Sequence, residues 1–335
     1  MFFTVNLKNR IFIFQTMLDT FVQKCPLPVF YLKENQIEYI RKLGEGISEV
    51  YHIKFNDKDY AGKIYTKYDI DDILYETEIA EKLKNTKQSM KTLGVIFLDN
   101  DKIIMLMELF ISDGDVYDYI QKKNRWTPCF YNKELKTLRP EPKTHYIYYN
   151  KDENIHWCYD LSEKQKMKIA LSISKAIDEL HNVGIIHGDI KTNNLVLHYG
   201  PKKQTVKIID FGMSYFKESD NLMEIEVKTG TEGYRAPEQD NYMINEKTDI
   251  YSMGVTIIEI WNGDIWYEGK SFKESRKEVL RGLRNLEKTN LELGKLLRKS
   301  INLDHKKRPS ANIFFKKLRE ISVNNGHIYK SKTQD

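Results

Sequence analysis

The sequence predicts an α+β protein made of two parts, a small sheet-rich part followed by a larger part that is mainly helical. Its 335 residues, 41% of them hydrophobic, exceed the roughly 100 to 200 residues of one ordinary domain and can bury a substantial core. Apolar and polar residues alternate through much of residues 39–108, as strands require. From about residue 114 the apolar residues instead recur at helical spacing.

Five strands are predicted in the sheet-rich part. Residues 37–55 alternate around a glycine-containing turn, which indicates two antiparallel strands. Residues 59–68 continue the pattern as a third strand. Residues 91–109 carry two more strands, separated by the turn residues Asp99, Asn100 and Asp101.

One helix interrupts these strands at residues 69–85. It opens with acidic residues, which suit the positive end of a helix dipole. The pattern predicts one amphipathic helix, with apolar residues at Ile73, Leu74, Tyr75, Ile79, Ala80 and Leu83.

The larger part contains a helix over residues 161–182, with Ser162 as its N-cap, and further helices over residues 249–322. Residues 121–160 are polar and aromatic with three prolines, which is typical of an inserted loop. We therefore expect an N-terminal extension over residues 1–38 without assigned elements, the two main parts over 39–108 and 109–324, and a tail over 325–335.

The composition favours an intracellular, cytoplasmic protein. Three widely spaced cysteines, Cys25, Cys129 and Cys158, suggest neither a disulfide framework nor a zinc site. Charges interrupt the apolar N-terminal residues and no cleavage site follows, so we expect neither a signal peptide nor a membrane span, and Met1 or Met17 can be the start. The abundance of Lys, Asn, Ile and Tyr is typical of AT-rich genomes. If the source is a large virus, the expected location of the protein is the host cytoplasm or the virion.

The net charge gives no reason to expect a nucleic-acid partner. The 53 Lys and Arg exceed the 48 Asp and Glu by five, and the lysines are scattered along the chain. Such a balance is typical of a solvated surface. The sequence predicts no oligomeric state.

Residues 187–194 read HGDIKTNN, and an Asp-Phe-Gly run follows at residues 210–212. Asp189 can accept the proton of an attacking hydroxyl, while Lys191 can offset charge that develops on a transferred phosphoryl group. Asn194 and Asp210 offer the oxygen ligands that Mg²⁺ prefers. This set of residues predicts phosphoryl transfer.

Together with the Ala-Pro-Glu run at residues 236–238, these motifs resemble the eukaryotic-type protein kinase superfamily, over roughly residues 39–322 and in the family's order. The resemblance implies a bilobal kinase fold, whose small antiparallel-sheet N-lobe carries one regulatory helix and whose C-lobe is larger and mainly helical. It implies ATP and Mg²⁺ as cofactors and a protein substrate. Lys191 and Thr231 are similar to residues of the serine/threonine class, so the acceptor would be a Ser or Thr hydroxyl.

The same resemblance implies an ATP site in the N-lobe. Residues 43–51 look like the glycine-rich loop, although the loop is one residue short, with Ser48 or Glu49 near the third glycine. Lys63 would hold the α and β phosphates, oriented by Glu76 or, alternatively, Glu78. The other residues implied at this site are Gly44 and Gly46 near the phosphates, Val50, Ala61 and Met107 around adenine, Glu108 to Phe110 with their backbone groups, and Asp115 or Asp113 at the ribose.

The resemblance also implies supporting contacts in the C-lobe. His187 would be structural, Asp249 would brace the catalytic loop, and Glu238 would pair with Arg308. Two alternatives stay open: a small-molecule phosphotransferase, because HGD followed by asparagine occurs in aminoglycoside and choline phosphotransferases, and a pseudokinase that binds nucleotide through its short loop.

Gly188 carries a prediction about control. Most members of the family have an arginine there, which grips a phosphate on the activation loop. We therefore expect activity that does not depend on loop phosphorylation, although Ser214, Ser219 and Thr229 are candidate acceptors.

Overall fold

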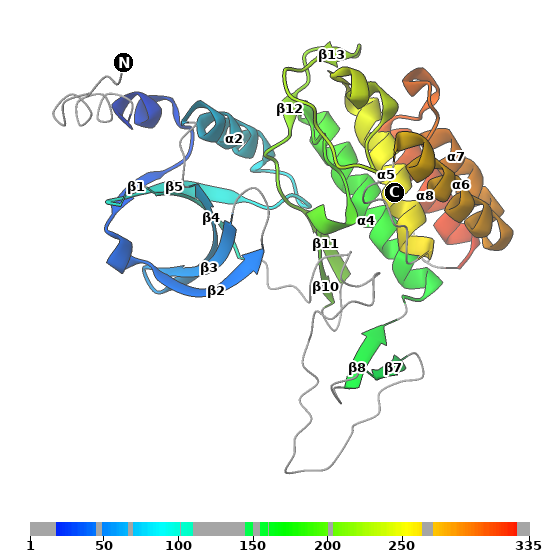
Figure 1. Cartoon of the computed structure of the whole chain (residues 1–335), viewed down its shortest axis with the longest axis horizontal. Coiled ribbons are helices and arrows are strands. Elements are labelled where there is room, and N and C mark those ends of the chain that lie inside the picture. The colour runs from blue at the N-terminus through cyan, green and yellow to red at the C-terminus, as the bar shows by residue number, and fades with distance from the viewer. Residues whose placement is uncertain are drawn as a thin grey trace, which may run out of the picture. The chain divides into compact units, whose positions relative to one another are not determined.

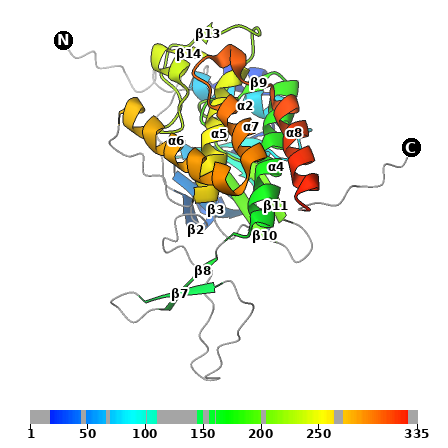
Figure 2. The same ribbon diagram turned by 90° about the vertical axis from the view of Figure 1, so that its right-hand side faces the viewer.

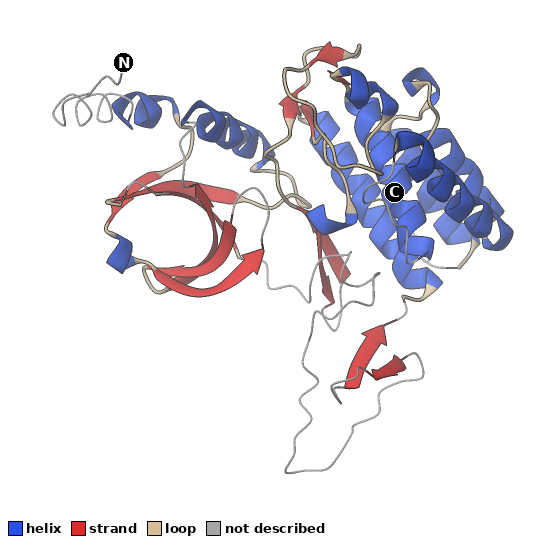
Figure 3. Ribbon diagram, in the orientation of Figure 1, coloured by secondary structure: helices blue, strands red, loops and turns tan. Residues whose placement is uncertain are grey.

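The structure is a computed structural model that describes residues 18–44, 49–65, 70–100, 102–109, 145–149, 155–159, 161–199, 204–262 and 271–326. Contacts divide the chain into two compact units. We call residues 1–85 with 90–110 the sheet unit, and residues 86–89 with 111–335 the helical unit. Strands make up most of the described part of the sheet unit, and helices make up most of the described part of the helical unit (Figure 3). The α+β prediction is therefore confirmed. The lobe boundary predicted at residues 108 and 109 stays a prediction.

The sheet unit is built on a six-stranded sheet of order β1-β5-β6-β4-β3-β2, which curls into an open barrel (Figure 1). The five predicted strands are present as β2 (Glu38–Gly44), β3 (Glu49–Phe55), β4 (Lys58–Tyr65), β5 (Thr92–Leu98) and β6 (Ile103–Glu108), and neighbouring pairs among them are antiparallel. Alternation puts one side chain in two inside the curl. The buried cluster there consists of Ile37, Ile53, Phe55, Ile64, Ile96, Leu98, Ile104 and Leu106.

The predicted helix is α2 (Ile70–Leu83), which begins with Asp71 and Asp72 in its first turn. Its apolar stripe is buried as expected at Ile73, Leu74, Ile79 and Leu83, whereas Ala80 is half-buried and Tyr75 is exposed. The stripe joins a second core cluster with β5 and β6 that includes Val95, Phe97 and Met105.

The segment before Glu38 contributes elements that the sequence analysis did not assign. A helix over residues 18–24 (helix 18–24) lies beside α2, and β1 (Val29–Leu32) pairs in parallel with β5, followed by the short η1 (Glu34–Gln36). Phe21 is 1% exposed and meets Phe97 edge-to-face at 5.2 Å between ring centroids. The described part of the extension therefore completes the core of the sheet unit.

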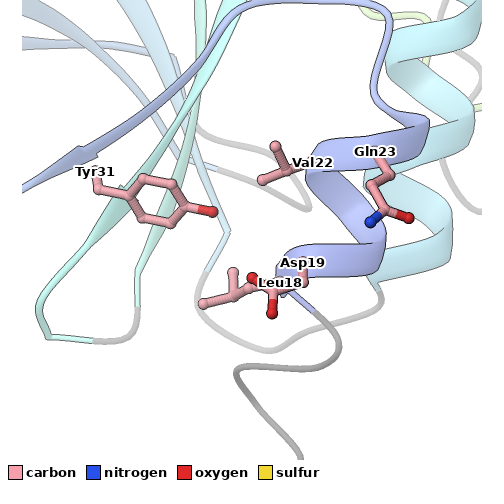
Figure 4. A pocket seen from close by; sticks show the side chains of 5 residues that line it. All are labelled: Leu18, Asp19, Val22, Gln23 and Tyr31. Atoms are coloured by element: carbon pink, nitrogen blue, oxygen red, sulfur yellow. The ribbon is translucent and has the colours of Figure 1, made fainter.

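Helix 18–24 and β1 also line a cavity of about 560 Å³ (Figure 4). Its lining includes apolar and polar side chains, and the phenol of Tyr31 points toward it. Burial, with a smaller contribution from the charge of Asp19, raises the pKa of Tyr31. The lining residues are Leu18, Asp19, Val22, Gln23 and Tyr31, and none of the predicted site residues is among them.

The helical unit packs its helices around α5 (Glu246–Asn262), as Figure 2 shows. Every residue of α5 from 248 to 261 is buried. The Oγ of Ser162 accepts a hydrogen bond from the Gln165 amide, so the predicted N-cap is confirmed. Gln88 also belongs to this unit, and its carbonyl accepts the Ile208 amide at 2.8 Å. The other helices are α4 (Glu163–Asn182), α6 (Phe272–Thr289), α7 (Leu291–Ser300) and α8 (Ala311–Asn324).

Short strands and turns of the helical unit lie between α4 and α5 in the chain. They are β9 (Ile185–Ile186), η2 (Thr192–Asn194), β10 (Leu195–Tyr199), β11 (Gln204–Ile208), β12 (Tyr215–Phe216), β13 (Met223–Glu224), η3 (Pro237–Asn241) and β14 (Met243–Ile244); η4 (His305–Lys307) precedes α8. These segments carry the phosphoryl-transfer motifs.

The prediction of a loop over residues 121–160 is wrong for its last part. β7 (His145–Tyr149) and β8 (Ile155–Tyr159) form an antiparallel hairpin with five paired positions. Both strands consist mostly of aromatic and β-branched residues, which favour strand formation. The three prolines that suggested a loop all lie before residue 145. Residues 121–144 lie outside the described part, as does the helical pattern predicted from residue 114.

None of the helices in the described ranges combines the length and the apolar character needed to cross a membrane.

Candidate active site

In the sheet unit, Lys63 and Glu76 form an ion pair. β4 places Lys63 between Val50 of β3 and Met105 of β6, and α2 presents Glu76 to it. The Nζ of Lys63 lies 3.0 and 3.1 Å from the two carboxylate oxygens of Glu76, and both side chains are largely buried. Glu78 is exposed on the same helix. Of the two predicted carboxylates, the structure therefore brings Glu76 to the lysine.

Tyr65 is a third member of this group that sequence reasoning missed. Its hydroxyl donates to Glu76 Oε2 at 2.6 Å, and Lys63 Nζ lies 5.3 Å from the centre of its ring. Burial, followed by the negative charge of Glu76, raises the pKa of Tyr65 well above its ordinary value. The phenol therefore stays protonated and holds the carboxylate in place.

The predicted adenine-site residues lie on adjacent strands. Ala61 is buried and pairs across the sheet with Met107, and Val50 is half-buried opposite Gly44. The amide of Glu108 donates to the Lys91 carbonyl at 2.8 Å, so that amide is engaged within the sheet. Five of the predicted residues lie outside the described part: Gly46, Ser48, Phe110, Asp113 and Asp115.

In the helical unit, Asp189 is held by three side chains. Thr231 donates to Oδ1 at 2.7 Å, Lys191 pairs with Oδ2 at 2.9 Å, and the amide of Asn194 reaches Oδ2 at 3.2 Å. Lys191 also donates to the Thr231 hydroxyl at 2.7 Å, which closes a triangle. A carboxylate fixed in this way can act as a positioned proton acceptor.

Asn194 and Asp210 lie on segments that are hydrogen-bonded to each other, because the Ile209 amide donates to the Asn194 carbonyl at 3.0 Å. The side-chain nitrogen of Asn194 donates to the carbonyl oxygen and to Oδ2 of Asp189, so the side-chain oxygen of Asn194 is the atom that could bind a metal. Asp210 is exposed and has a positive φ of 62°. Within the described ranges, no three His, Cys, Asp or Glu side chains gather into a metal cage. One carboxylate and one amide oxygen still fit Mg²⁺, which usually keeps waters and phosphate oxygens as its remaining ligands.

Asp249 holds the backbone at the start of residues 187–194 in place. Asp249 accepts the amides of His187 and Gly188, each at 2.9 Å, and the ring of His181 at 2.9 Å. Burial by itself would raise the pKa of Asp249, but the hydrogen bond and charge of His181, with those of His187, outweigh it and lower the pKa. The predicted brace is confirmed, and His181 is a partner that sequence reasoning missed.

The ring of His187 links the loop to the Asp-Phe-Gly run. Its Nε2 donates to the Ile209 carbonyl at 3.2 Å, and its ring meets Phe211 edge-to-face at 5.2 Å. Both contacts join residues 187–194 to the segment of the Asp-Phe-Gly run, which fits the structural role predicted for His187.

Residues 146–318, more than half of the chain, match the protein kinase domain family. The chain belongs to the protein kinase family. The match begins within the predicted insert and covers most of the helical unit.

Relatives of this kinase domain carry similar names. Serine/threonine-protein kinase CDG1 of Arabidopsis thaliana is 39% identical over 117 residues, which are 31% of this chain and 26% of that protein. Serine/threonine-protein kinase STY46 of the same plant is 31% identical over 186 residues, 52% of this chain and 32% of that protein. The probable serine/threonine-protein kinase fnkE of Dictyostelium discoideum is 29% identical over 190 residues, 55% of this chain and 12% of that protein. The chain thus spans well under two thirds of the length of these relatives.

Two buried ion and hydrogen-bond networks fix the kinase motifs to the helices. Glu238 pairs with Arg308 through two contacts of 2.5 and 2.8 Å, as predicted, and the guanidinium also lies over the ring of Tyr251. The second network was not predicted: Thr192 and Tyr234 both reach Glu259 Oε2 on α5, at 3.2 and 2.5 Å. The Glu238–Arg308 pair was implied by the family resemblance, whereas the motifs that carry that resemblance do not include Glu259.

Proposed function

We propose that this chain is an ATP- and Mg²⁺-dependent protein kinase that phosphorylates serine or threonine hydroxyls of a protein substrate. The observation that carries the proposal is the geometry around Asp189, whose two oxygens are fixed by Thr231, Lys191 and Asn194. Such a carboxylate aligns a hydroxyl and receives its proton, and alignment matters more here than a raised pKa.

In the proposed reaction, the hydroxyl oxygen attacks the γ-phosphorus while its proton moves to Asp189. The bond between the γ-phosphorus and the bridging oxygen breaks, and ADP leaves. Lys191 offsets charge on the moving phosphoryl group. Asn194 and Asp210 would hold Mg²⁺, which supplies charge neutralisation on the phosphates. The paired Lys63 would hold the α and β phosphates.

The remaining parts of the proposal follow the sequence. An N-lobe over residues 39–108 and a C-lobe over residues 109–324 would carry these residues. The three widely spaced cysteines favour a reducing, intracellular location. The names of the relatives, and the Lys191 to Thr231 contact at 2.7 Å, support a serine/threonine acceptor.

The test is label transfer from ATP to a degenerate peptide library, using the full chain. Asp189→Asn and Lys63→Met should each lower the rate roughly 100- to 10,000-fold, because they remove the proton acceptor and the phosphate contact. The matched controls are Asp57→Asn and Lys82→Met, at exposed positions, which should keep the parent rate. Equal labelling by Asp189→Asn and the parent would contradict the proposal.

One observation favours a second candidate, because Gly188 in HGD also fits phosphotransferases that act on small molecules. The same assay should therefore include aminoglycosides, choline and sugars as acceptors. Turnover of one of these far above the peptides would replace the protein-kinase proposal. Nucleotide binding without transfer to any acceptor would instead indicate a pseudokinase.

A further inference from the structure

Gly188 occupies a position that no side chain fits. Its φ is +79°, in the left-handed region that glycine adopts without strain, and a Cβ there would overlap the carbonyl oxygen of Met213. The Ile244 side chain closes the space further, at 3.4 Å. With this backbone an arginine at position 188 has no room, so the loop must be secured by another group.

Gln239 contacts the carbonyl of Gly188 directly. This side chain of η3 is fully buried, and its Nε2 donates to Gly188 O at 2.8 Å and to Thr229 Oγ1 at 2.9 Å. Its Oε1 accepts the Ala236 amide at 2.9 Å. Both amide hydrogens and the oxygen of the glutamine are therefore engaged.

Residues 228–238, which resemble the end of the activation segment in the family, are shaped to receive this amide. Gly230 has a φ of +82°, and a Cβ on it would meet Gln239 Nε2 at 2.8 Å, so glycine lets the amide pass. Arg235 holds the Gly230 carbonyl from the other side, at 2.8 and 3.1 Å. The next residue is Thr231, whose hydroxyl donates to Asp189. A continuous set of contacts thus joins Gln239 to the residue that orients Asp189.

We propose that Gln239 is a positioning residue, a neutral latch that holds residues 229–231 against the catalytic loop where most protein kinases use an arginine and a phosphate. The inference rests on the proposed function for its consequence, which is a peptide-binding segment that is assembled without phosphorylation. A neutral amide suits the place because its two N–H groups donate to Gly188 O and Thr229 Oγ1, which are both uncharged acceptors. A glutamate of the same size could donate to neither.

Two of the three candidate phosphorylation sites are buried, and one of them, Thr229, is held by the latch itself. Thr229 is 1% exposed and accepts from Gln239, while Ser214 is 3% exposed and donates to the His187 carbonyl at 3.1 Å. A kinase acting in trans cannot reach either hydroxyl in this structure. Ser219 is exposed and is the candidate that stays accessible.

The experiment uses the full chain after phosphatase treatment, with loss of phosphate checked by mass spectrometry. Gln239→Glu should raise the KM for peptide and lower kcat/KM roughly 10- to 100-fold, with the KM for ATP unchanged, because only the peptide segment loses its latch. Thr229→Val should act in the same direction, and Thr229→Ser, which restores the oxygen, should recover the parent rate. The matched control is Gln23→Glu at an exposed position.

A second measurement separates the latch from the proposed function. Amide hydrogen exchange at residues 229–231 should be about tenfold faster in Gln239→Glu and Thr229→Val than in the parent and in Gln23→Glu, whether or not the chain transfers phosphate. Unchanged exchange and unchanged peptide KM in both variants would overturn the latch. A parent without any transfer activity, but with faster exchange in the variants, would overturn the proposed function and leave the latch standing.

Discussion

The residues around Asp189 show how this site fixes a carboxylate through donors from different segments. Thr231 comes from the activation segment, whereas Lys191 and Asn194 follow Asp189 within the same loop. Behind the loop, Asp249 accepts two consecutive backbone amides and is 1% exposed. Charge-assisted hydrogen bonds of this kind are stronger than neutral ones, and they fix the loop backbone rather than one side chain.

Asp249 should make the stability of the helical unit depend on acid. Its folded pKa is lowered from 3.8, so its ionised form stabilises the fold above that value, and this contribution is lost as the pH falls through the folded pKa. Asp249→Asn should lower the free energy of unfolding by about 2 to 4 kcal/mol at pH 7, because an amide NH₂ would face backbone donors.

Urea unfolding of both proteins between pH 7 and pH 3 would measure this difference. The variant should lose less stability than the parent over that range, whereas Asp57→Asn at an exposed turn should follow the parent. Parallel curves for Asp249→Asn and the parent would contradict the assignment of acid sensitivity to Asp249.

At the scale of elements, local patterns predict those parts of the fold that carry their own periodicity. β2 to β6 and α2 each show it over at least six residues, and all were predicted. β1 has four residues, and its partner β5 lies more than sixty positions later, so its place depends on a distant strand. Helix 18–24 likewise depends on Phe97 and α2 to bury its apolar residues.

The same distinction holds for the candidate site. Glu76 could be chosen over Glu78 because the apolar register of α2 leaves Glu76 next to the buried face. Tyr65 and Gln239 could not be found, because their partners come from other segments and no family motif includes them. Motifs predicted the reacting groups, while the residues that hold these groups required the fold.

Helix 18–24 should stabilise the position of α2. The Cys25 thiol contacts Thr77, the neighbour of Glu76, at 3.7 Å. Phe21 belongs to the buried cluster that α2 forms with β5 and β6. Phe21→Ala should lower the free energy of unfolding by about 3 to 5 kcal/mol through the cavity it leaves. It should also weaken nucleotide binding, since α2 carries Glu76.

Thermal unfolding and nucleotide titration would measure both effects. Val22→Ala is the matched control, because Val22 is the next residue and is 41% exposed. If Phe21→Ala behaved like Val22→Ala in both measurements, the contact between helix 18–24 and the core would have no energetic role.

For the whole molecule, the two cores depend on different stretches of the chain. The helical unit packs around α5, and apart from residues 86–89 it comes from the chain after residue 110. The core of the sheet unit combines early and late residues of that unit, because helix 18–24 packs into one buried cluster with β5 and β6, and β1 pairs with β5. Residues 18–38 therefore pack with the sheet unit, and the lobe boundary predicted at residue 39 stays a prediction.

A chain that starts at Met17 and one that starts at Tyr39 should differ for this reason. The first keeps helix 18–24 and β1, and therefore keeps the buried cluster that these elements form with β5 and β6. The second uncovers the edge of β5 and the buried side chains of Val95 and Phe97, and an exposed apolar strand edge promotes association. Urea unfolding with light scattering would compare these two chains with the parent. A Tyr39 chain that stayed monomeric and as stable as the parent would show that residues 39–108 form a complete lobe, and that helix 18–24 and β1 only cover it.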